Sequence, residues 1–296
     1  MESNKIVVDL SNILIAHLMN NIGSTKHDQF VLDLPMLRHT VLNQIRSIRV
    51  KFKGEYPETV IACDGSSSWR KNVFPYYKAA RRENREASSL DWNSIFSALN
   101  MIRDEISETF PYACVLVNEA EADDVIGVLA REAEEKDFKL MIVATDKDFK
   151  QLHGWNVQQY DPIKKKVFRE NSPEEFLIEH VIRGDRGDGV PNVLSSDDCF
   201  VMKKRQGVLS QKRYDDVRSK MINEHSTLSI KDASEEITRN TYRNITMIDL
   251  RRTPLEISEK ILKEYESQKN KQPGNIMSYM MKNRLKELTA SVTDFY

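Results

Sequence analysis

The chain has 296 residues, of which 40% are hydrophobic and 30% charged, and its formal net charge is -1. This composition is typical of a folded globular protein and excludes a disordered or fibrous one. No apolar run approaches the ~20 residues of a membrane span, and no signal peptide is recognisable. The three cysteines, Cys63, Cys114 and Cys199, are widely spaced, so we expect reduced thiols in a cytoplasmic protein.

Strand-like and helix-like segments alternate along the first half of the chain. Short runs rich in valine and isoleucine predict strands, and apolar residues every three or four positions predict helices. In chain order these are a strand at 5–10, a helix at 37–52, a strand at 59–65, a helix at 95–106, a strand at 112–118, a helix at 122–133 and a strand at 140–146. The alternation predicts an α/β fold with a mostly parallel central sheet flanked by helices.

The strand signals fade after about residue 184. The remaining chain is charged and has mostly helical spacing, interrupted by Pro254 and by Pro273 and Gly274. We therefore expect a main α/β domain over residues 1–183 and a smaller, mainly helical region over residues 184–296.

Acidic residues follow the predicted strands. Asp9, Asp64 and Asp146 each end one, and Asp148 lies two residues further on. Five more acids lie at or near predicted helix starts and in a "GDRGD" segment: Glu121, Asp123, Asp124, Asp185 and Asp188. Because ligands bind outside the carboxyl ends of parallel strands, these side chains are expected to converge on one edge of the sheet.

Each acid also has a simpler interpretation. A lone aspartate after a strand is usually a turn residue or a helix N-cap, and Asn118 with Glu121 resembles a capping box. As a set, however, two carboxylates ~4 Å apart repel by roughly 4 kcal/mol at an effective dielectric constant of about 20. A fold stable by only about 5–15 kcal/mol needs cations to offset several such pairs. Carboxylate ligands favour Mg²⁺, with Mn²⁺ as a substitute, and the number of acids suggests two ions.

Basic residues gather in two other segments. Residues 69–86 hold six basic residues and two acidic ones. Lys78 lies there next to Tyr77, and we expect Arg70, Lys71 and Arg85 to follow a nucleic-acid backbone while aromatic rings stack on unpaired bases. The alternative interpretation is a solvated, charged helix. The second segment contains Lys203, Lys204, Arg205, Lys212 and Arg213 without an acid.

Six motifs, in their order and spacing, resemble the structure-specific 5′ nuclease (flap endonuclease) superfamily. They are "VVDLSN", "ACDG", "YYKAARR", "EAEADDVIG", "VATDKDFKQL" and "GDRGD". Within that superfamily the chain is most similar to the T-even phage type of ribonuclease H. The resemblance covers about the first 190 residues, and the charged tail ending in "LTASVTDFY" also looks like the phage type.

The resemblance implies a role for each residue. Two metal ions would be bound by Asp9, Asp64, Glu121, Asp123, Asp146, Asp148, Asp185 and Asp188, with Asp124 beside them. Lys78 would contact the scissile phosphate, and Arg81 or Arg82 would add charge stabilisation within a flexible arch over residues 66–90.

The resemblance also implies an activity. It is 5′ to 3′ hydrolysis of RNA–DNA hybrids, duplex DNA and 5′ flaps, which removes RNA primers during phage DNA replication in the bacterial host cytoplasm. Single-strand-binding protein and a sliding clamp would be partners, and we expect a monomer without membrane association.

The chain departs from the family at Gly189, where relatives usually have asparagine followed by a glycine-rich hairpin that grips duplex backbone. We expect the basic segment over 203–213 to take over part of that work through salt-sensitive phosphate contacts. Three alternatives remain: a catalytically inactive branched-DNA-binding module, a PIN-type ribonuclease, and an Asp-nucleophile phosphotransferase. The last needs Asp-x-Asp on the first strand, but here Asp9 is followed by Leu10 and Ser11.

Overall fold

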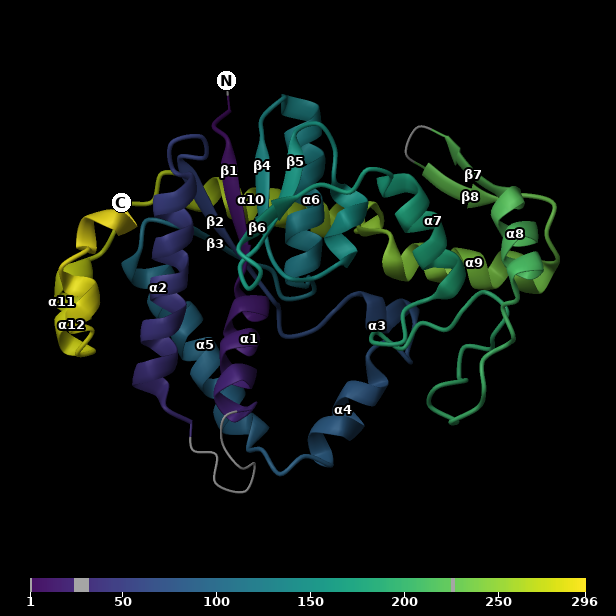
Figure 1. The fold of residues 1–296 in the computed structure, drawn as a ribbon, viewed down its shortest axis with the longest axis horizontal. Helices are drawn as coiled ribbons and strands as arrows, with labels where there is room; N and C mark the ends of the chain where they lie inside the picture. Colours follow the sequence, from purple (N-terminus) through teal and green to yellow (C-terminus); the bar gives the residue numbers. More distant parts are fainter. Residues whose placement is uncertain (1, 24–31, 225–226) are drawn as a thin grey trace.

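The computed structural model describes residues 2–23, 32–224 and 227–296, and its centre is a six-stranded sheet in the order β3-β2-β1-β4-β5-β6 (Figure 1). The strands are β1 (Lys5–Asp9), β2 (Glu58–Cys63), β3 (Ala113–Leu116), β4 (Leu140–Val143), β5 (Val157–Asp161) and β6 (Lys166–Phe168). The first five are parallel, and only the edge strand β6 runs antiparallel to its neighbour. The predicted mostly parallel α/β fold is confirmed. Strands β5 and β6 were not predicted, because Gln158 and Gln159 interrupt the apolar run of β5.

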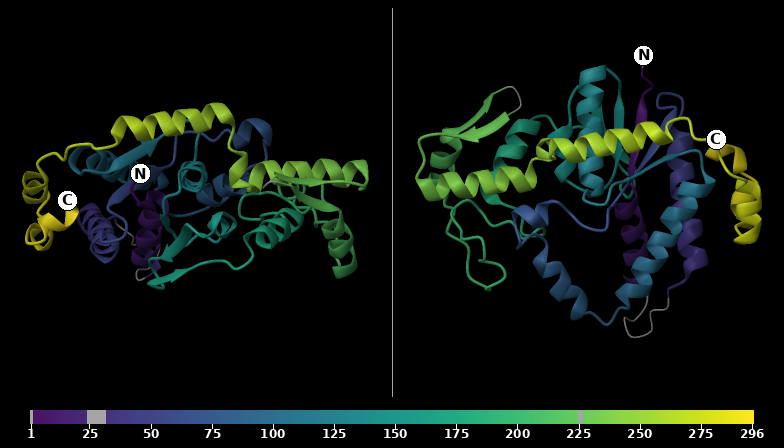
Figure 2. Two further views of the ribbon diagram at one scale, coloured as in Figure 1. Left: turned by 90° about the horizontal axis from the view of Figure 1, so that it is seen from above. Right: turned by 180° about the vertical axis from the view of Figure 1, so that it is seen from behind.

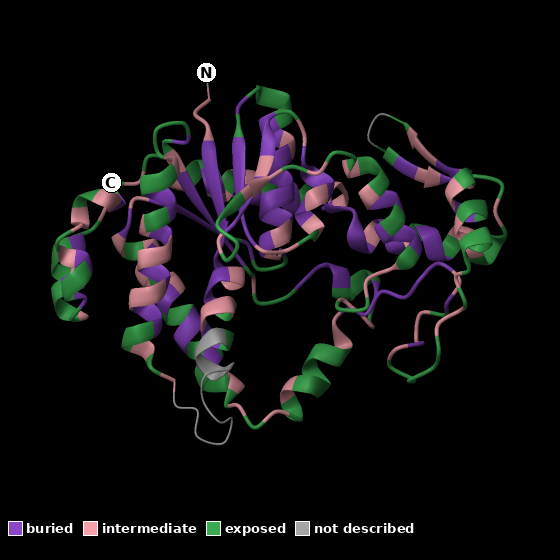
Figure 3. Cartoon of the chain, viewed as in Figure 1, coloured by how far each residue is buried: buried purple, intermediate pink, exposed green. Residues whose placement is uncertain are grey.

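Helices cover both faces of this sheet. One face packs on α1 (Leu10–Gly23), α2 (Leu34–Phe52) and α5 (Trp92–Thr109), and the other on α6 (Ala122–Lys136), α7 (Pro173–Arg183) and the one-turn helix η2 (Asp148–Leu152). The alternation along β1 explains the two layers. Val7 points into one apolar cluster, and Ile6 and Val8 point into the other. Figure 3 shows the result, since the strands between the two helix layers are buried.

The C-terminal region is mainly helical, as expected, but it includes a short hairpin. Its elements are α8 (Gln211–Lys220), β7 (Met221–Glu224), β8 (Thr227–Ile230), α9 (Glu235–Ile248), η3 (Leu250–Arg252), α10 (Leu255–Gln268), α11 (Ile276–Lys282), α12 (Lys286–Thr289) and η4 (Val292–Phe295). Helix α10 returns across the back of the molecule, where Gln268 hydrogen bonds to the backbone of Cys114 in β3 (Figure 2). One apolar cluster contains residues from both sides of residue 183, such as Val7 and Ile245. Among the described helices, none is both long and apolar enough to cross a membrane.

The segment predicted as an arch forms an arm that stands off the sheet. It contains α3 (Arg70–Val73) and α4 (Ala79–Glu86), and it joins the end of β2 to α5. None of the residues of α4 is buried. Its basic side chains are therefore presented to solvent, while the base of the arm lies against the body of the protein.

Candidate active site

Seven carboxylates from distant parts of the chain line one cavity of about 580 Å³. They are Asp9, Asp64, Asp123, Asp146, Asp148, Asp185 and Asp188. The cations Lys78, Arg81 and Lys147 line the same cavity. The structure thus brings together the acids that the sequence placed only at the ends of separate elements.

The parallel register explains the convergence. Asp9 is the last residue of β1 and pairs with Ala62 of β2, so Asp64 follows at nearly the same level of the sheet. Asp146 comes three residues after β4, and its loop is held by Gln159, which donates hydrogen bonds of 2.8 Å to the carbonyl oxygens of Ala144 and Asp146. The buried glutamine of β5 therefore positions an acid of the cavity, a role that its sequence did not signal.

The simpler interpretations of these acids also hold in part. Asp9 accepts a hydrogen bond of 2.9 Å from the backbone N–H of Asn12, at the start of α1. Asp64 accepts one of 2.9 Å from the N–H of Ala122 and thereby fixes the start of α6. The predicted capping box at Asn118 is wrong, because Glu121 is the N-cap of α6. Asp9 and Asp64 therefore each accept a hydrogen bond at the start of a helix and also line the cavity.

Crowding of the carboxylates is visible in their proton affinities. Burial raises the pKa of Asp9 to about 7, and the charges of Asp64 and Asp146 contribute to the rise. Burial likewise raises the pKa of Asp148 to about 7, with a further contribution from Asp146. The pKa of Asp123 lies well above its usual value, mainly because of burial. Burial and the neighbouring negative charges thus favour protons on Asp9, Asp123 and Asp148.

His180 was missed by the sequence interpretation, as was Lys147, which lines the cavity and lies 3.7 Å from Asp185 Oδ2. The Nε2 of His180 lies 2.9 Å from Asp185 Oδ2, and its Nδ1 lies 3.7 Å from Asp148 Oδ1. One ligand atom from each of these three residues lies within 4.8 Å of the others. The hydrogen bond to His180 keeps the pKa of Asp185 below its usual range. A lone histidine in the last turn of α7 gives no sequence signal, because only the fold places it beside the acids.

Lys78 is held at the base of the arm by two acids. Its backbone is left-handed, with φ of 55°, and its N–H donates a hydrogen bond of 2.8 Å to the carbonyl oxygen of Asp188. Its Nζ lies 2.6 Å from Glu121 Oε1 and 3.7 Å from Asp188 Oδ2. Burial opposes ionisation of Glu121, but Lys78 and Arg70 outweigh it and lower the pKa of Glu121 to about 2. Glu121 therefore acts here as the counter-charge of Lys78 and does not line the cavity.

The two candidate arginines of the arm differ in position. Arg81 pairs with Asp188 and lines the cavity. Arg82 pairs with Glu86 along the exposed side of α4 and does not line the cavity. The structure therefore distinguishes Arg81 from Arg82 as a group close to the acids.

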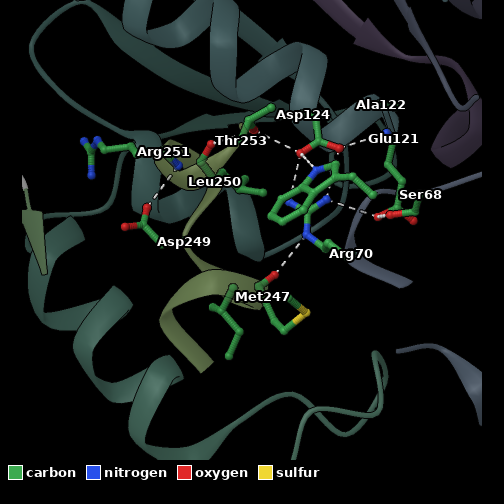
Figure 4. Close-up of polar contacts among 12 residues, drawn as sticks. Ser68, Arg70, Glu121, Ala122, Asp124, Met247, Asp249, Leu250, Arg251 and Thr253 are labelled. Atoms are coloured by element: carbon green, nitrogen blue, oxygen red, sulfur yellow. Dashed lines mark hydrogen bonds and ion pairs between the residues drawn. The ribbon is translucent and has the colours of Figure 1, made fainter. Parts of the chain in front are cut away.

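Four assignments made from the sequence are not supported, and the first is Glu121 as a metal ligand, because it pairs with Lys78 and does not line the cavity. Asp124 is fully buried, and its oxygens accept hydrogen bonds from Trp69, Arg70, Thr253 and the backbone of Glu121, so it has no position for a metal (Figure 4). Arg70 is 1% exposed and cannot reach nucleic acid. Tyr77 is also buried, and its hydroxyl donates to Glu121 or Asp188, so its ring is not available to stack on a base.

The other basic residues lie on the surface. Lys71 is exposed, and Arg85 is half-buried over the ring of Phe96. In the second basic segment, Lys203, Lys204, Arg205, Lys212 and Arg213 are all exposed. Lys204 pairs with Asp198 at 2.9 Å. None of these residues lines the carboxylate cavity, so any contact with a ligand would be outside it.

A second cavity adjoins the first. It has a volume of about 550 Å³ and lies beside α1 and α5, where Phe96 and Arg103 form part of its wall. Asp64, Ser11 and Ile15 line both cavities. The carboxylate site therefore shares a wall with a second hollow of similar size at the base of the arm.

Comparison with known proteins agrees with this geometry. A family model described as "5'-3' exonuclease, N-terminal resolvase-like domain" matches residues 35–179, and one described as "T4 RNase H, C terminal" matches residues 171–295. Ribonuclease H of Enterobacteria phage T4 is 30% identical over 295 residues, which cover 98% of this chain and 95% of the relative. Flap endonuclease Xni of Shewanella denitrificans is 34% identical over 144 residues, which cover 45% of this chain and 53% of that protein.

Solved structures show the same fold. The 5′-exonuclease of phage T5 with bound zinc has a TM-score of 0.64 at 17% identity, over 90% of this chain and 99% of that one. A variant T5 flap endonuclease in a pseudo-enzyme–product complex with DNA and metal ions has a TM-score of 0.64 at 16% identity, over the same shares.

Proposed function

The chain belongs to the 5′–3′ exonuclease family that includes phage T4 ribonuclease H, and is thus a hydrolase of the nuclease class; from this we propose a specific activity. It is divalent-metal-dependent 5′ to 3′ hydrolysis of phosphodiester bonds at the 5′ ends of RNA–DNA hybrids and duplex DNA and at 5′ flaps. Its role is the removal of RNA primers during phage DNA replication.

The observation that carries this proposal is the cavity in which seven carboxylates face three cations, Lys78, Arg81 and Lys147. The donors are carboxylate oxygens, which suit Mg²⁺ and Mn²⁺. Asp148 Oδ1 is buried without a hydrogen-bond partner, and burial together with neighbouring carboxylates raises the pKa values of Asp9 and Asp148. These features fit a site built for divalent ions.

We assign the acids to two ions. Asp9, Asp64, Asp123 and Asp146 would hold one, and Asp148, Asp185 and Asp188 would hold the other, partly through water. When bound, two such ions supply an activated water at neutral pH and stabilise the charges on the attacking and leaving oxygens. His180 orients Asp185 through the hydrogen bond of 2.9 Å, as a group behind a metal ligand commonly does.

Two basic residues of the chain would bind the phosphate. Lys78 enters the cavity from the base of the arm, and we propose that it binds the scissile phosphate and stabilises the charge that develops on it. Arg81 adds charge from the next turn of the arm. Burial lowers the pKa of Lys78, but the charges of Asp188 and Glu121 outweigh it and raise that pKa, so the lysine stays ionised while it is positioned.

Surface cations would extend the contact along the nucleic acid. Lys71, Arg82 and Arg85 belong to the arm, and the exposed segment over 203–213 lies in the C-terminal region. We propose that both bind backbone phosphates, which makes binding sensitive to salt. By analogy with the phage type, the protein would act as a monomer in the host cytoplasm, alongside single-strand-binding protein and a sliding clamp.

One experiment tests the activity. A 5′-labelled RNA–DNA hybrid and a 5′-flap duplex are incubated with the protein in Mg²⁺, with and without a chelator, and the Asp146→Asn variant serves as the matched control. We expect short 5′ products from both substrates with wild-type protein, and none with chelator or with the variant. Binding of flap DNA without cleavage in Mg²⁺ or Mn²⁺ would instead identify an inactive DNA-binding module.

A further inference from the structure

Arg70 is a buried charge that direct contact with metal or nucleic acid does not explain. It begins α3 at the base of the arm, and its side chain is 1% exposed. A charged group is buried in a protein only where several partners compensate for the water it loses. The partners of Arg70 therefore indicate what it is for.

Those partners lie on two other parts of the chain (Figure 4). Its NH1 donates to Glu121 Oε2 at 3.2 Å and to Asp124 Oδ2 at 3.0 Å, and its NH2 lies 3.0 Å from Asp124 Oδ1. Its Nε donates to the carbonyl oxygen of Met247 at 3.1 Å, at the end of α9. The planar guanidinium thus joins the arm, the start of α6 and the C-terminal region at one point.

Glu121 contacts both Arg70 and the catalytic lysine, Lys78. Glu121 uses Oε2 for Arg70, Tyr77 and Ser68, and it uses Oε1 for Lys78 at 2.6 Å. A carboxylate fixed on one oxygen by three donors has little freedom to rotate. The position of the Lys78 ammonium group therefore depends on the groups that hold the far oxygen of Glu121.

The segment over residues 247–253 is itself held on several sides. Thr253 donates a hydrogen bond of 3.0 Å to Asp124. Gln151, a buried residue of η2 close to Asp146 and Asp148, donates to the carbonyl oxygen of Ile248 at 3.0 Å and accepts from the N–H of Leu250 at 2.9 Å. The segment therefore contacts α6 and η2, two elements that carry acids of the cavity, and the arm that carries Lys78.

A small cavity of about 10 Å³ lies between Arg70 with its 247–253 partners and the acids of the carboxylate cavity. Its lining combines Arg70, Met247, Ile248 and Leu250 with the metal-site acids Asp123, Asp148, Asp185 and Asp188. The 247–253 segment thus forms part of the wall behind the acids.

We propose that Arg70 is a positioning residue of the nuclease reaction, which holds Glu121 against the fixed 247–253 segment so that Lys78 is aimed at the phosphate. The inference rests on the proposed function and adds a role for the C-terminal region. Besides presenting basic residues to nucleic acid, that region holds Arg70 through the carbonyl oxygen of Met247 and so helps to position the catalytic lysine. Lysine cannot replace Arg70, because one ammonium group cannot make the paired contact with Asp124 and reach Glu121 and Met247 at the same time.

The first test compares two conservative variants of buried arginines. Arg70→Lys removes the guanidinium geometry and keeps the charge. Arg49→Lys is the matched control, because Arg49 is also buried but donates to Thr59, at the opposite end of β2 from Asp64. Single-turnover cleavage of a 5′-flap duplex is measured in Mg²⁺, binding is measured in Ca²⁺, and thermal melting checks folding.

We expect Arg70→Lys to slow cleavage by about 10-fold or more, as a misplaced catalytic group does, with less than about a 2-fold change in the dissociation constant. Arg49→Lys should change neither value. Equal rates for Arg70→Lys and wild type, or equal losses in the two variants, would overturn the inference. Wild-type protein that does not cleave at all would instead count against the proposed function.

A double-mutant cycle separates positioning from general destabilisation. If Arg70 acts through Lys78, the Arg70→Lys/Lys78→Ala protein should cleave within about 2-fold of the rate of Lys78→Ala alone. Losses that multiply would show that Arg70 acts elsewhere. Should Arg70→Lys not fold, Thr253→Val removes one donor to Asp124 and leaves Arg70 in place. It should give a smaller loss of about 2- to 5-fold that again disappears in the Lys78→Ala background, and multiplying losses would again contradict the inference.

Discussion

At the scale of single residues, the site shows how far charge and sequence position determine function. The acids at the strand ends could be found from the sequence, because a buried parallel strand fixes where the next residue points. Burial could not be found in this way. Arg70 and Lys71 are adjacent and equally basic, yet Arg70 lies in the core and Lys71 in solvent. One of the partners that hold Arg70 there, the carbonyl oxygen of Met247, is 177 residues away in the chain.

Removing one carboxylate should separate activity from stability. Asp146→Asn keeps an oxygen that can accept the hydrogen bond from the N–H of Asp148, but it removes a charge that repels its neighbours. We expect cleavage to be lost. In chelator, unfolding should need roughly 1 kcal/mol more free energy, or about 2–4 °C in melting temperature. A metal-free variant that melts below wild type would contradict the crowding of the acids.

The same crowding predicts a pH dependence of stability. Asp9 and Asp148 have pKa values of about 7 in the folded protein, above the usual value of 3.8 that applies when it unfolds. Between these values the folded state holds protons that the unfolded state has lost, so metal-free stability should fall as pH rises from about 4 to 7. Melting curves in chelator and in Mg²⁺ across this range check it. The decline should be smaller in Mg²⁺, and an equal decline in both would contradict a metal at these acids.

The two arginines of the arm provide a contrast for Lys78. Lys78→Ala should slow single-turnover cleavage by about 100-fold or more with little change in binding, because its contact is with the reacting phosphate. Arg81→Ala should cause a smaller loss. Arg82→Ala, which changes a residue paired with Glu86 outside the cavity, should keep the wild-type cleavage rate at saturating protein and weaken binding only slightly. A comparable loss of binding and rate in Lys78→Ala would show that Lys78 serves only to bind the nucleic acid.

At the scale of elements, the sequence predicted helices α2, α5 and α6 and the four core strands, but it did not predict α1, which follows β1 directly. It missed the elements whose patterns are short or mixed. Strand β6 has three residues, and β7 and β8 have four each, too few to show a period against a charged background. The cavity nevertheless depends on one such element, because Gln159 of β5 holds the loop of Asp146.

The basic segment of the C-terminal region can be tested as a unit. Charge reversal of Lys203, Lys204 and Arg205 should weaken duplex binding and flatten its dependence on salt, because fewer counterions are released. Reversal of Lys260 and Lys263 on α10 is the control and should leave the salt slope unchanged. If the 203–205 variant has the wild-type slope, the segment is a solvated face, as Lys204 with its Asp198 partner would suggest.

At the scale of the whole molecule, the arm, the sheet edge and the C-terminal region share one site. The charge pattern along the chain separated acids from bases, but the fold brings them within contact, as Lys78 with Glu121 and Arg81 with Asp188 show. The division expected near residue 183 describes composition more than packing, since α10 returns onto β3 and α6. How the C-terminal region supports the site could not be predicted, because its contacts come from tertiary packing.

The most direct test of the account is to locate divalent ions in the protein. Crystals grown in Mn²⁺ and measured at its absorption edge should show anomalous density inside the carboxylate cavity. One peak is expected beside Asp9, Asp64 and Asp146, and a second beside Asp148 and Asp185. A cavity without a peak at saturating Mn²⁺, or peaks only at surface acids elsewhere, would contradict the claim that these crowded carboxylates exist to bind metal.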